Sequence, residues 1–94
     1  MIRSFKTKDA ESIWLGNQIK QFARELQNIA RRKLRMMNNA SRLSDLLMPP
    51  GNRLEALKGS RRGQHSIRIN DQVRICFVWK DGDCHEVEIV DYHS

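Results

Sequence analysis

The chain has 94 residues, with 17 Lys or Arg against 11 Asp or Glu, so its formal net charge is +6. We expect a single domain over residues 1–94, because so short a chain can fill a core with only one sheet and one or two helices. The charge favours nucleic acid, an acidic protein or an anionic membrane surface as partner. Membranes are the least favoured, since no apolar run approaches the ~20 residues of a spanning helix and no signal-peptide core appears. We therefore expect a cytoplasmic protein.

The first 16 residues are predicted to form an edge strand followed by a short helix. Ile2 and Phe5 stand among basic residues in segment 1–5, which favours an edge strand. Thr7 is expected to cap a short helix that ends at Gly16 and turns Trp14 toward the core.

Apolar residues at spacings of three and four predict a longer helix of about five turns from Asn17 to about Asn39. They are Ile19, Phe22, Ala23, Leu26, Ile29, Ala30, Leu34 and Met37. The other side of this helix carries a basic cluster: Arg24, Arg31, Arg32, Lys33 and Arg35. Such a cluster is usually a solvated surface, although an acidic partner or an RNA backbone would also suit it.

A short helix over about 41–47 is expected next, and Pro49, Pro50 and Gly51 stop it. Residues 53–58 are then predicted to form a strand that leads into a turn at 59–63. This turn is strongly basic, with Lys58, Arg61 and Arg62 just ahead of the last strands.

The last third of the chain predicts an antiparallel meander. Apolar residues alternate at Ile67 and Ile69, from Val73 to Trp79, and at Val87 and Ile89. If the apolar residues of the first two strands face each other, Ile67 lies opposite Ile75 and Arg68 lies opposite Arg74. A three-residue loop of Lys80, Asp81 and Gly82 would further pair Ile75 with Val87, and Arg74 with Glu88. In this register Cys76 and Cys84 share a face but lie diagonally, so we expect both to be reduced.

Two arginines facing each other across strands, Arg68 and Arg74, destabilise a sheet unless an anion lies between them. Glu88 can neutralise only one of them. A solvated basic face and a phosphate site are about equally favoured by this stretch alone. The element order gives an α+β fold, with an N-terminal strand and two to three helices packed on a mostly antiparallel sheet.

The second half carries a set of motifs, PPGNRLEALKGSRRGQHSIRINDQVRICFVWKDGD with a terminal VEIVDYH. These motifs resemble the HigB branch of the RelE and ParE toxin superfamily, whose RelE-like fold has the same element order. The resemblance implies a type II toxin that cleaves messenger RNA, usually on the translating ribosome. It also implies a cognate helix-turn-helix antitoxin as partner, through which the complex binds operator DNA.

The resemblance places the functional positions at Lys58, Arg74, Asp91, Tyr92 and His93. The charge of the predicted turn and sheet adds Arg61, Arg62 and Arg68 as RNA-binding residues. The chain departs from the family pattern at Glu55, where some relatives have histidine, and at Val73, where many have tryptophan.

Cleavage by such a site requires no metal, because attack by the 2′-hydroxyl needs only proton transfer and stabilisation of negative charge. We expect no cofactor, since neither a CxxC nor an HxxxH spacing occurs. Arg74, Lys58 and Arg68 suit the stabilising role, while His93, Asp91 and Tyr92 suit acid, base or stacking roles that the sequence does not divide among them. The alternatives are a ParE-like inhibitor of gyrase without catalysis, and an RNA-binding module without catalysis.

Overall fold

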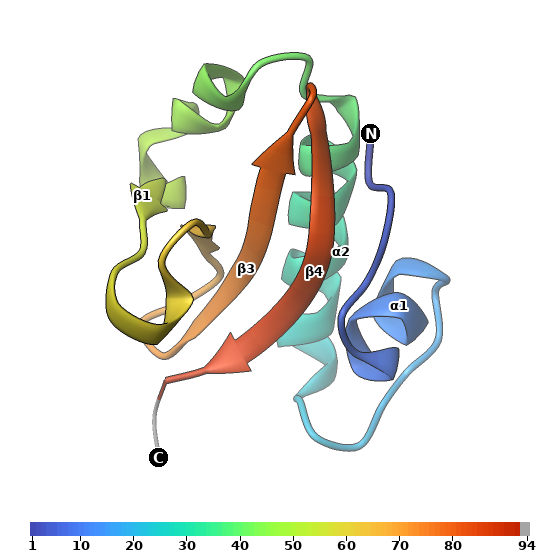
Figure 1. Ribbon diagram of the computed structural model, residues 1–94. Coiled ribbons are helices and arrows are strands. Elements are labelled where there is room, and N and C mark those ends of the chain that lie inside the picture. The colour runs from blue at the N-terminus through green and yellow to red at the C-terminus, as the bar shows by residue number, and fades with distance from the viewer. Residues whose placement is uncertain (93–94) are drawn as a thin grey trace.

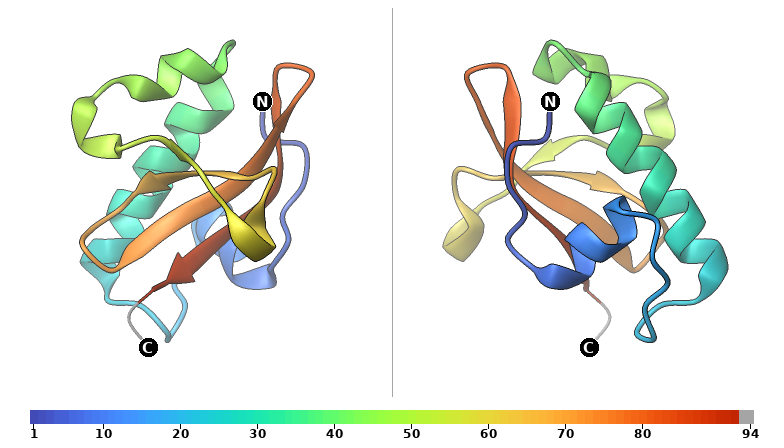
Figure 2. Two further views of the ribbon diagram at one scale, coloured as in Figure 1. Left: turned by 60° about the vertical axis from the view of Figure 1, so that its left-hand side comes forward. Right: turned by 90° about the vertical axis from the view of Figure 1, so that its right-hand side faces the viewer.

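The computed structural model describes residues 1–92, and its centre is a four-stranded antiparallel sheet in the order β1-β2-β3-β4. The strands are β1 (Glu55–Ala56), β2 (His65–Arg68), β3 (Val73–Lys80) and β4 (Asp83–Asp91). Two α-helices, α1 (Lys8–Trp14) and α2 (Arg24–Asn39), pack on one face of the sheet (Figures 1 and 2). The predicted α+β fold is confirmed. No helix within residues 1–92 is long and apolar enough to cross a membrane.

The N-terminal segment runs beside β4, as Figure 1 shows. It forms two isolated parallel bridges, Ile2 with Cys84 and Phe5 with Val87, instead of a continuous strand. The predicted cap of α1 is confirmed, because the Thr7 Oγ1 accepts a hydrogen bond from the Ala10 amide at 3.3 Å. Trp14 packs inward, with its ring centre 6.4 Å from that of Phe5.

The second helix begins seven residues later than the sequence predicted, at Arg24 instead of Asn17. Residues 17–23 form a loop, and the side chain of Gln27 holds it in place. Its amide accepts from the Ile19 amide at 2.9 Å and donates to the Ile19 and Phe22 carbonyls at 2.8 and 2.6 Å. Ile19 and Phe22 still pack on the core, so their helical spacing reflects burial of a loop and not a helix.

Three short 3₁₀ turns, η1 (Leu43–Leu47), η2 (Pro50–Asn52) and η3 (Gly59–Arg61), connect α2 to the last strands. The predicted helix at 41–47 is η1, and the predicted strand at 53–58 is only the two-residue β1 at the sheet edge. Asn52 is fully buried between these turns and α2. Its side-chain amide donates to the Leu46 carbonyl at 3.1 Å and to the Met48 carbonyl at 3.3 Å.

The core lies between α2 and the sheet, and its largest buried side chains include Leu34, Met37, Ile67, Ile75 and Phe77. The predicted pairing of β2 with β3 is confirmed, with Ile67 opposite Ile75 and Arg68 opposite Arg74. A slip of one residue would turn Ile67 and Ile75 to opposite faces, so burial of both excludes it.

The predicted pairing of β3 with β4 is wrong. Lys80 pairs with Asp83 across a two-residue turn in which Asp81 and Gly82 have φ of 54° and 80°. A bulge at Glu86 (φ 53°) then shifts the register by one residue, so that Ile75 lies opposite Ile89 and Cys76 opposite Glu88. The bulge keeps apolar residues paired without the three-residue loop that strict alternation required.

The two-residue turn also separates the two cysteines, because it places Cys84 opposite Trp79, so that Cys84 and Cys76 do not share a face as predicted. Cys84 lies in the core, where its Sγ is 3.9 Å from the Met37 carbonyl, whereas Cys76 contacts Tyr92 on the opposite face. Both are free thiols and both are buried. Burial raises the pKa of Cys84 to about 11.

We expect the folded protein to resist alkylation by iodoacetamide at pH 8 and to react quickly once it is unfolded in guanidinium, because only an exposed thiolate is nucleophilic. Because the Cys84 thiol loses its proton less readily in the folded than in the unfolded protein, the free energy of unfolding is highest below pH 9. It falls as the pH rises from about 9 to 11. Urea unfolding at pH 8 and pH 11 measures this loss, and Cys84→Ala should remove the Cys84 part of it. Equal alkylation of folded and unfolded protein would contradict the burial of both thiols.

Candidate active site

The face of the sheet away from α2 carries a group of polar side chains that we call the arginine face. It consists of Ser66, Arg68, Arg74, Cys76, Glu88 and Tyr92, supplied by β2, β3, β4 and the residue after β4. Alternation explains this placement, because Val73 and Ile75 are buried in the core and the side chain of Arg74 between them leaves by the other face.

Arg74 lies at the junction of β1, β2 and β3, and its side chain is only 13% exposed. Its Nε donates to the Ser66 Oγ at 2.7 Å, and its Nη2 donates to the Arg53 carbonyl at 2.6 Å. The Glu55 carboxylate lies 3.6 Å from the same Nη2. Within residues 1–92 no acceptor is hydrogen-bonded to Nη1, so a fixed guanidinium keeps donors for an incoming anion.

A second cation reaches the arginine face from η3. The Arg61 Nη1 donates to the Glu88 carboxylate at 3.0 Å and to the Gln64 Oε1 at 3.1 Å, and the Lys6 Nζ lies 3.4 Å from the same carboxylate. The hydrogen bond with Glu88 raises the pKa of Arg61. Glu88, 9% exposed, therefore ties the η3 loop and the N-terminal segment to β4.

Tyr92 completes the arginine face where β4 ends. Its amide donates to the Gln72 carbonyl at 2.7 Å, which fixes the backbone, and its Oη lies 3.5 Å from the Cys76 Sγ. Partial burial of the phenol and its contact with Cys76 raise the pKa of Tyr92 to about 12, against the opposing effect of Arg61 and Arg74. The phenol is therefore protonated at neutral pH, beside two guanidinium groups.

Residues 3–93 match the family model for HigB-like toxins, described as RelE-like toxins of type II toxin-antitoxin systems. The chain belongs to the HigB-like toxin family. It is 47% identical to Toxin HigB-1 of Vibrio cholerae over 57 residues, which are 61% of this chain and 60% of that toxin. The match thus spans less than two thirds of the relative's length.

A second relative of this HigB-like toxin is an uncharacterised protein of Haemophilus influenzae, 32% identical over 69 residues, covering 73% of this chain and 67% of the relative. Among solved structures, a chain of the YoeB-YefM complex from Staphylococcus aureus superposes with a TM-score of 0.64 over 100% of this chain and 99% of that one. At 17% identity, this likeness shows the fold alone.

The HigB-like toxin brings together only part of the set of residues predicted from sequence. Arg74, Tyr92 and Arg61 meet on the arginine face, and Arg68 lies on it opposite Arg74. Lys58 and Arg62 are exposed on either side of η3, next to Arg61. Asp91 lies opposite Val73, on the helix side of the sheet, and His93 is outside the described residues.

Although Arg68 and Arg74 face each other, they share no carboxylate within residues 1–92. Arg68 forms an ion pair with Asp71, while Arg74 lies beside Glu55, and Glu88 pairs with Arg61 and Lys6. The two-residue turn and the bulge at Glu86 each shift the predicted register by one residue, and together they move Glu88 from Arg74 to Cys76. Each arginine thus has a partner of its own.

Sequence reasoning missed Ser66, Cys76 and the Glu88 contact with Arg61. Ser66 and Cys76 were detectable in principle, since they stand two residues from Arg68 and Arg74 and therefore share their face. The Glu88 contact was not, because it depends on the path of the loop from Leu57 to Gln64. Within residues 1–92 no three His, Cys, Asp or Glu side chains gather closely enough to hold a metal ion.

Proposed function

We propose that this HigB-like toxin is an endoribonuclease that cleaves messenger RNA on the translating ribosome, with cationic side chains in place of a metal. The observation that carries the proposal is the arginine face, where the guanidinium of Arg74 is fixed by Ser66 and Arg53 beside the protonated Tyr92. Family membership supports a toxin of a type II system, and the charge of +6 suits a phosphate backbone.

In the proposed reaction the 2′-oxygen of one nucleotide attacks the adjacent phosphorus as its proton is removed. The bond from phosphorus to the 5′-oxygen breaks, and that oxygen takes up a proton, leaving a 2′,3′-cyclic phosphate and a 5′-hydroxyl. The phosphorane-like transition state carries additional negative charge on its oxygens. Arg74 is placed to stabilise this charge, because its position is already set before RNA binds.

Tyr92 is proposed as a hydrogen-bond or proton donor, since a phenol with a pKa of about 12 is not a base at neutral pH. The proton of the 2′-hydroxyl then goes to another group, and we propose His93, because histidine is the side chain most often used as a general base. Asp91 would orient that imidazole. Lys58, Arg61, Arg62 and Arg68 are proposed to hold the RNA backbone on either side of the scissile phosphate.

An antitoxin with a helix-turn-helix domain is proposed as the neutralising partner, and the complex would bind operator DNA through it. The family's description as part of a toxin-antitoxin system supports a protein partner. The cytoplasm is the proposed compartment, since messenger RNA and ribosomes are there.

Inducing the toxin in growing cells tests the activity. Transcripts should be cut within minutes while plasmid supercoiling is unchanged, and Arg74→Ala, induced to the same protein level, should leave transcripts intact. Loss of supercoiling with intact transcripts would instead indicate a ParE-like inhibitor of gyrase. Transcripts bound but uncut would indicate an RNA-binding module, and either result would overturn the proposal.

A further inference from the structure

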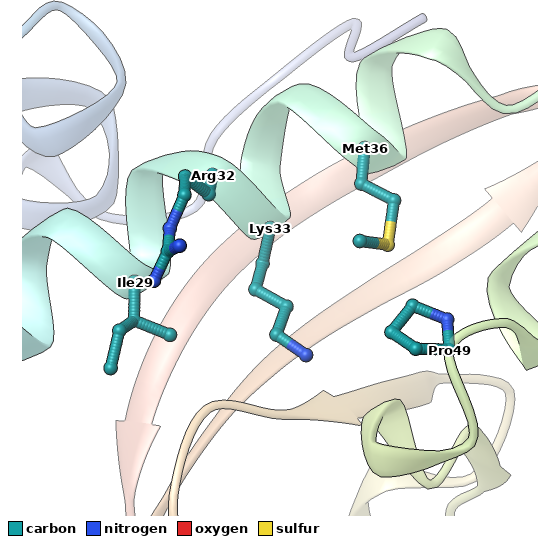
Figure 3. A pocket seen from close by; sticks show the side chains of 5 residues that line it. All are labelled: Ile29, Arg32, Lys33, Met36 and Pro49. Carbon is teal, nitrogen blue, oxygen red and sulfur yellow. The ribbon is translucent and has the colours of Figure 1, made fainter.

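A groove of about 260 Å³ lies beside α2, and neither Arg74 nor Tyr92 is among the residues that line it. It is lined by Ile29, Arg32, Lys33 and Met36 of α2 and by Pro49, which precedes η2. Figure 3 shows the four side chains along α2, with Pro49 across from Met36 and Lys33 and with Arg32 beside Ile29. No part of the proposed reaction uses these residues.

The groove carries positive charge without a described carboxylate to balance it. Lys33 donates to the Asn52 Oδ1, a neutral acceptor, and within residues 1–92 no acidic side chain forms an ion pair with Lys33 or Arg32. Burial lowers the pKa of Lys33, and the nearby charges of Arg32 and Arg68 lower it further. An anion placed here would relieve this repulsion.

The remaining walls are apolar, since Ile29, Met36 and Pro49 supply hydrocarbon and thioether surface. None of the five lining residues is aromatic, so the groove has no platform on which a nucleotide base can stack. A ligand that fits both the charge and the apolar wall is a peptide segment with carboxylates flanking an aliphatic side chain. Methionine suits such a surface because its side chain adapts to the shape of its partner.

We propose that this groove is the docking site for an acidic, partly aliphatic segment of the antitoxin. The inference rests on the proposed toxin function for the identity of the partner, and it assigns the partner's chemistry and its place on the toxin. Because the lining residues come from α2 and Pro49, a segment bound there need not contact Arg74 or Tyr92. This surface then contributes affinity separately from any contact that blocks RNA.

The test compares two charge reversals on one helix. Arg32→Glu reverses a charge on the groove, whereas Arg35→Glu makes the same change at an exposed α2 position outside it. A third variant, Lys33→Gln, removes the charge but keeps a donor for Asn52. The dissociation constant for purified antitoxin is measured by titration calorimetry at low and high salt, without RNA, after circular dichroism has shown that each variant is folded.

Arg32→Glu is expected to weaken antitoxin binding about tenfold or more, and Lys33→Gln several-fold, with both effects shrinking at high salt. Arg35→Glu should change affinity by no more than about twofold. Equal effects of Arg32→Glu and Arg35→Glu would overturn the proposal, as would a variant Arg32→Glu that binds RNA more weakly but antitoxin normally. Cleavage by the wild-type toxin is assayed separately, so failure of the groove assignment leaves the proposed activity standing.

Discussion

Replacing Arg74 with alanine is expected to lower the rate of mRNA cleavage by about a hundredfold or more. The guanidinium is held by Ser66 and Arg53, so its donors are in place before the transition state forms and cost no reorganisation. Growth inhibition should disappear together with cleavage. The assay is cleavage of a reporter transcript on translating ribosomes, with the antitoxin removed.

The same variant will also be less stable, because Arg74 links the segment around β1 to β2 and β3. Loss of its bonds to the Ser66 Oγ and the Arg53 carbonyl is expected to cost about 1–3 kcal/mol of unfolding free energy. Two matched variants separate stability from catalysis. Arg74→Lys keeps the charge without the planar fork, and Ser66→Ala keeps the arginine but removes the acceptor of its Nε.

We expect Arg74→Lys to retain more activity than Arg74→Ala but far less than the wild type, and Ser66→Ala to lose only part of the activity. Cleavage is compared at a temperature where all variants are folded. An Arg74→Ala protein that is folded and cleaves at the wild-type rate would show that the arginine face is not the active site.

The largest effect on stability is expected for Gln27→Ala. Gln27 is 1% exposed, and its amide forms three hydrogen bonds with the backbone of Ile19 and Phe22. Truncation leaves these buried groups without partners and opens a cavity, at a cost of about 2–4 kcal/mol. The melting temperature of a domain this size should fall by about 10 to 20 °C.

Gln21→Ala is the matched control, since Gln21 is exposed in the same loop and the change should cost less than about 0.5 kcal/mol. Thermal unfolding followed by circular dichroism measures both. Hydrogen exchange should also speed up at the Ile19 amide in Gln27→Ala. If both variants melt alike, the Gln27 side chain does not hold the loop of residues 17–23.

The parts of the fold that the sequence predicted are those fixed by burial of alternating residues. Pairing Ile67 with Ile75 puts both side chains in the core, and it brought Arg68 opposite Arg74 correctly. Thr7 was predicted as a cap because its hydroxyl has a local partner, the Ala10 amide. Both inferences rest on interactions whose partners are set by short-range spacing.

The errors arose where a local feature alters the period. Glu86 adopts a left-handed backbone conformation, which its residue type does not predict. Its amide donates a hydrogen bond to the Ser4 Oγ, 82 positions away. The start of α2 was missed because Ile19 and Phe22 continue the helical spacing while a side chain of the helix itself, Gln27, holds them in a loop. Long-range contacts decided both cases.

Some site residues could be placed from the sequence, and others depend on long-range contacts. Arg74 and Tyr92 reach the arginine face because alternation along β3 and β4 turns them there, and alternation is readable once the bulge is known. The contact of Arg61 with Glu88 requires the path of the loop from Leu57 to Gln64, which composition does not specify. Asp91 falls on the other side of the sheet from Arg74, so its proposed role depends on its connection to His93.

Analysis of the RNA ends tests the central claim most directly, since attack by the 2′-hydroxyl and hydrolysis by an activated water leave different products. Transcripts cut by the wild-type toxin in the presence of its ribosomal substrate are ligated to adaptors that discriminate 5′-hydroxyl from 5′-phosphate ends. We predict 5′-hydroxyl ends downstream and 2′,3′-cyclic phosphate ends upstream of each cut, both missing in Arg74→Ala. Cuts bearing 5′-phosphate and 3′-hydroxyl ends, or cyclic phosphate ends that persist at full yield in Arg74→Ala, would contradict it.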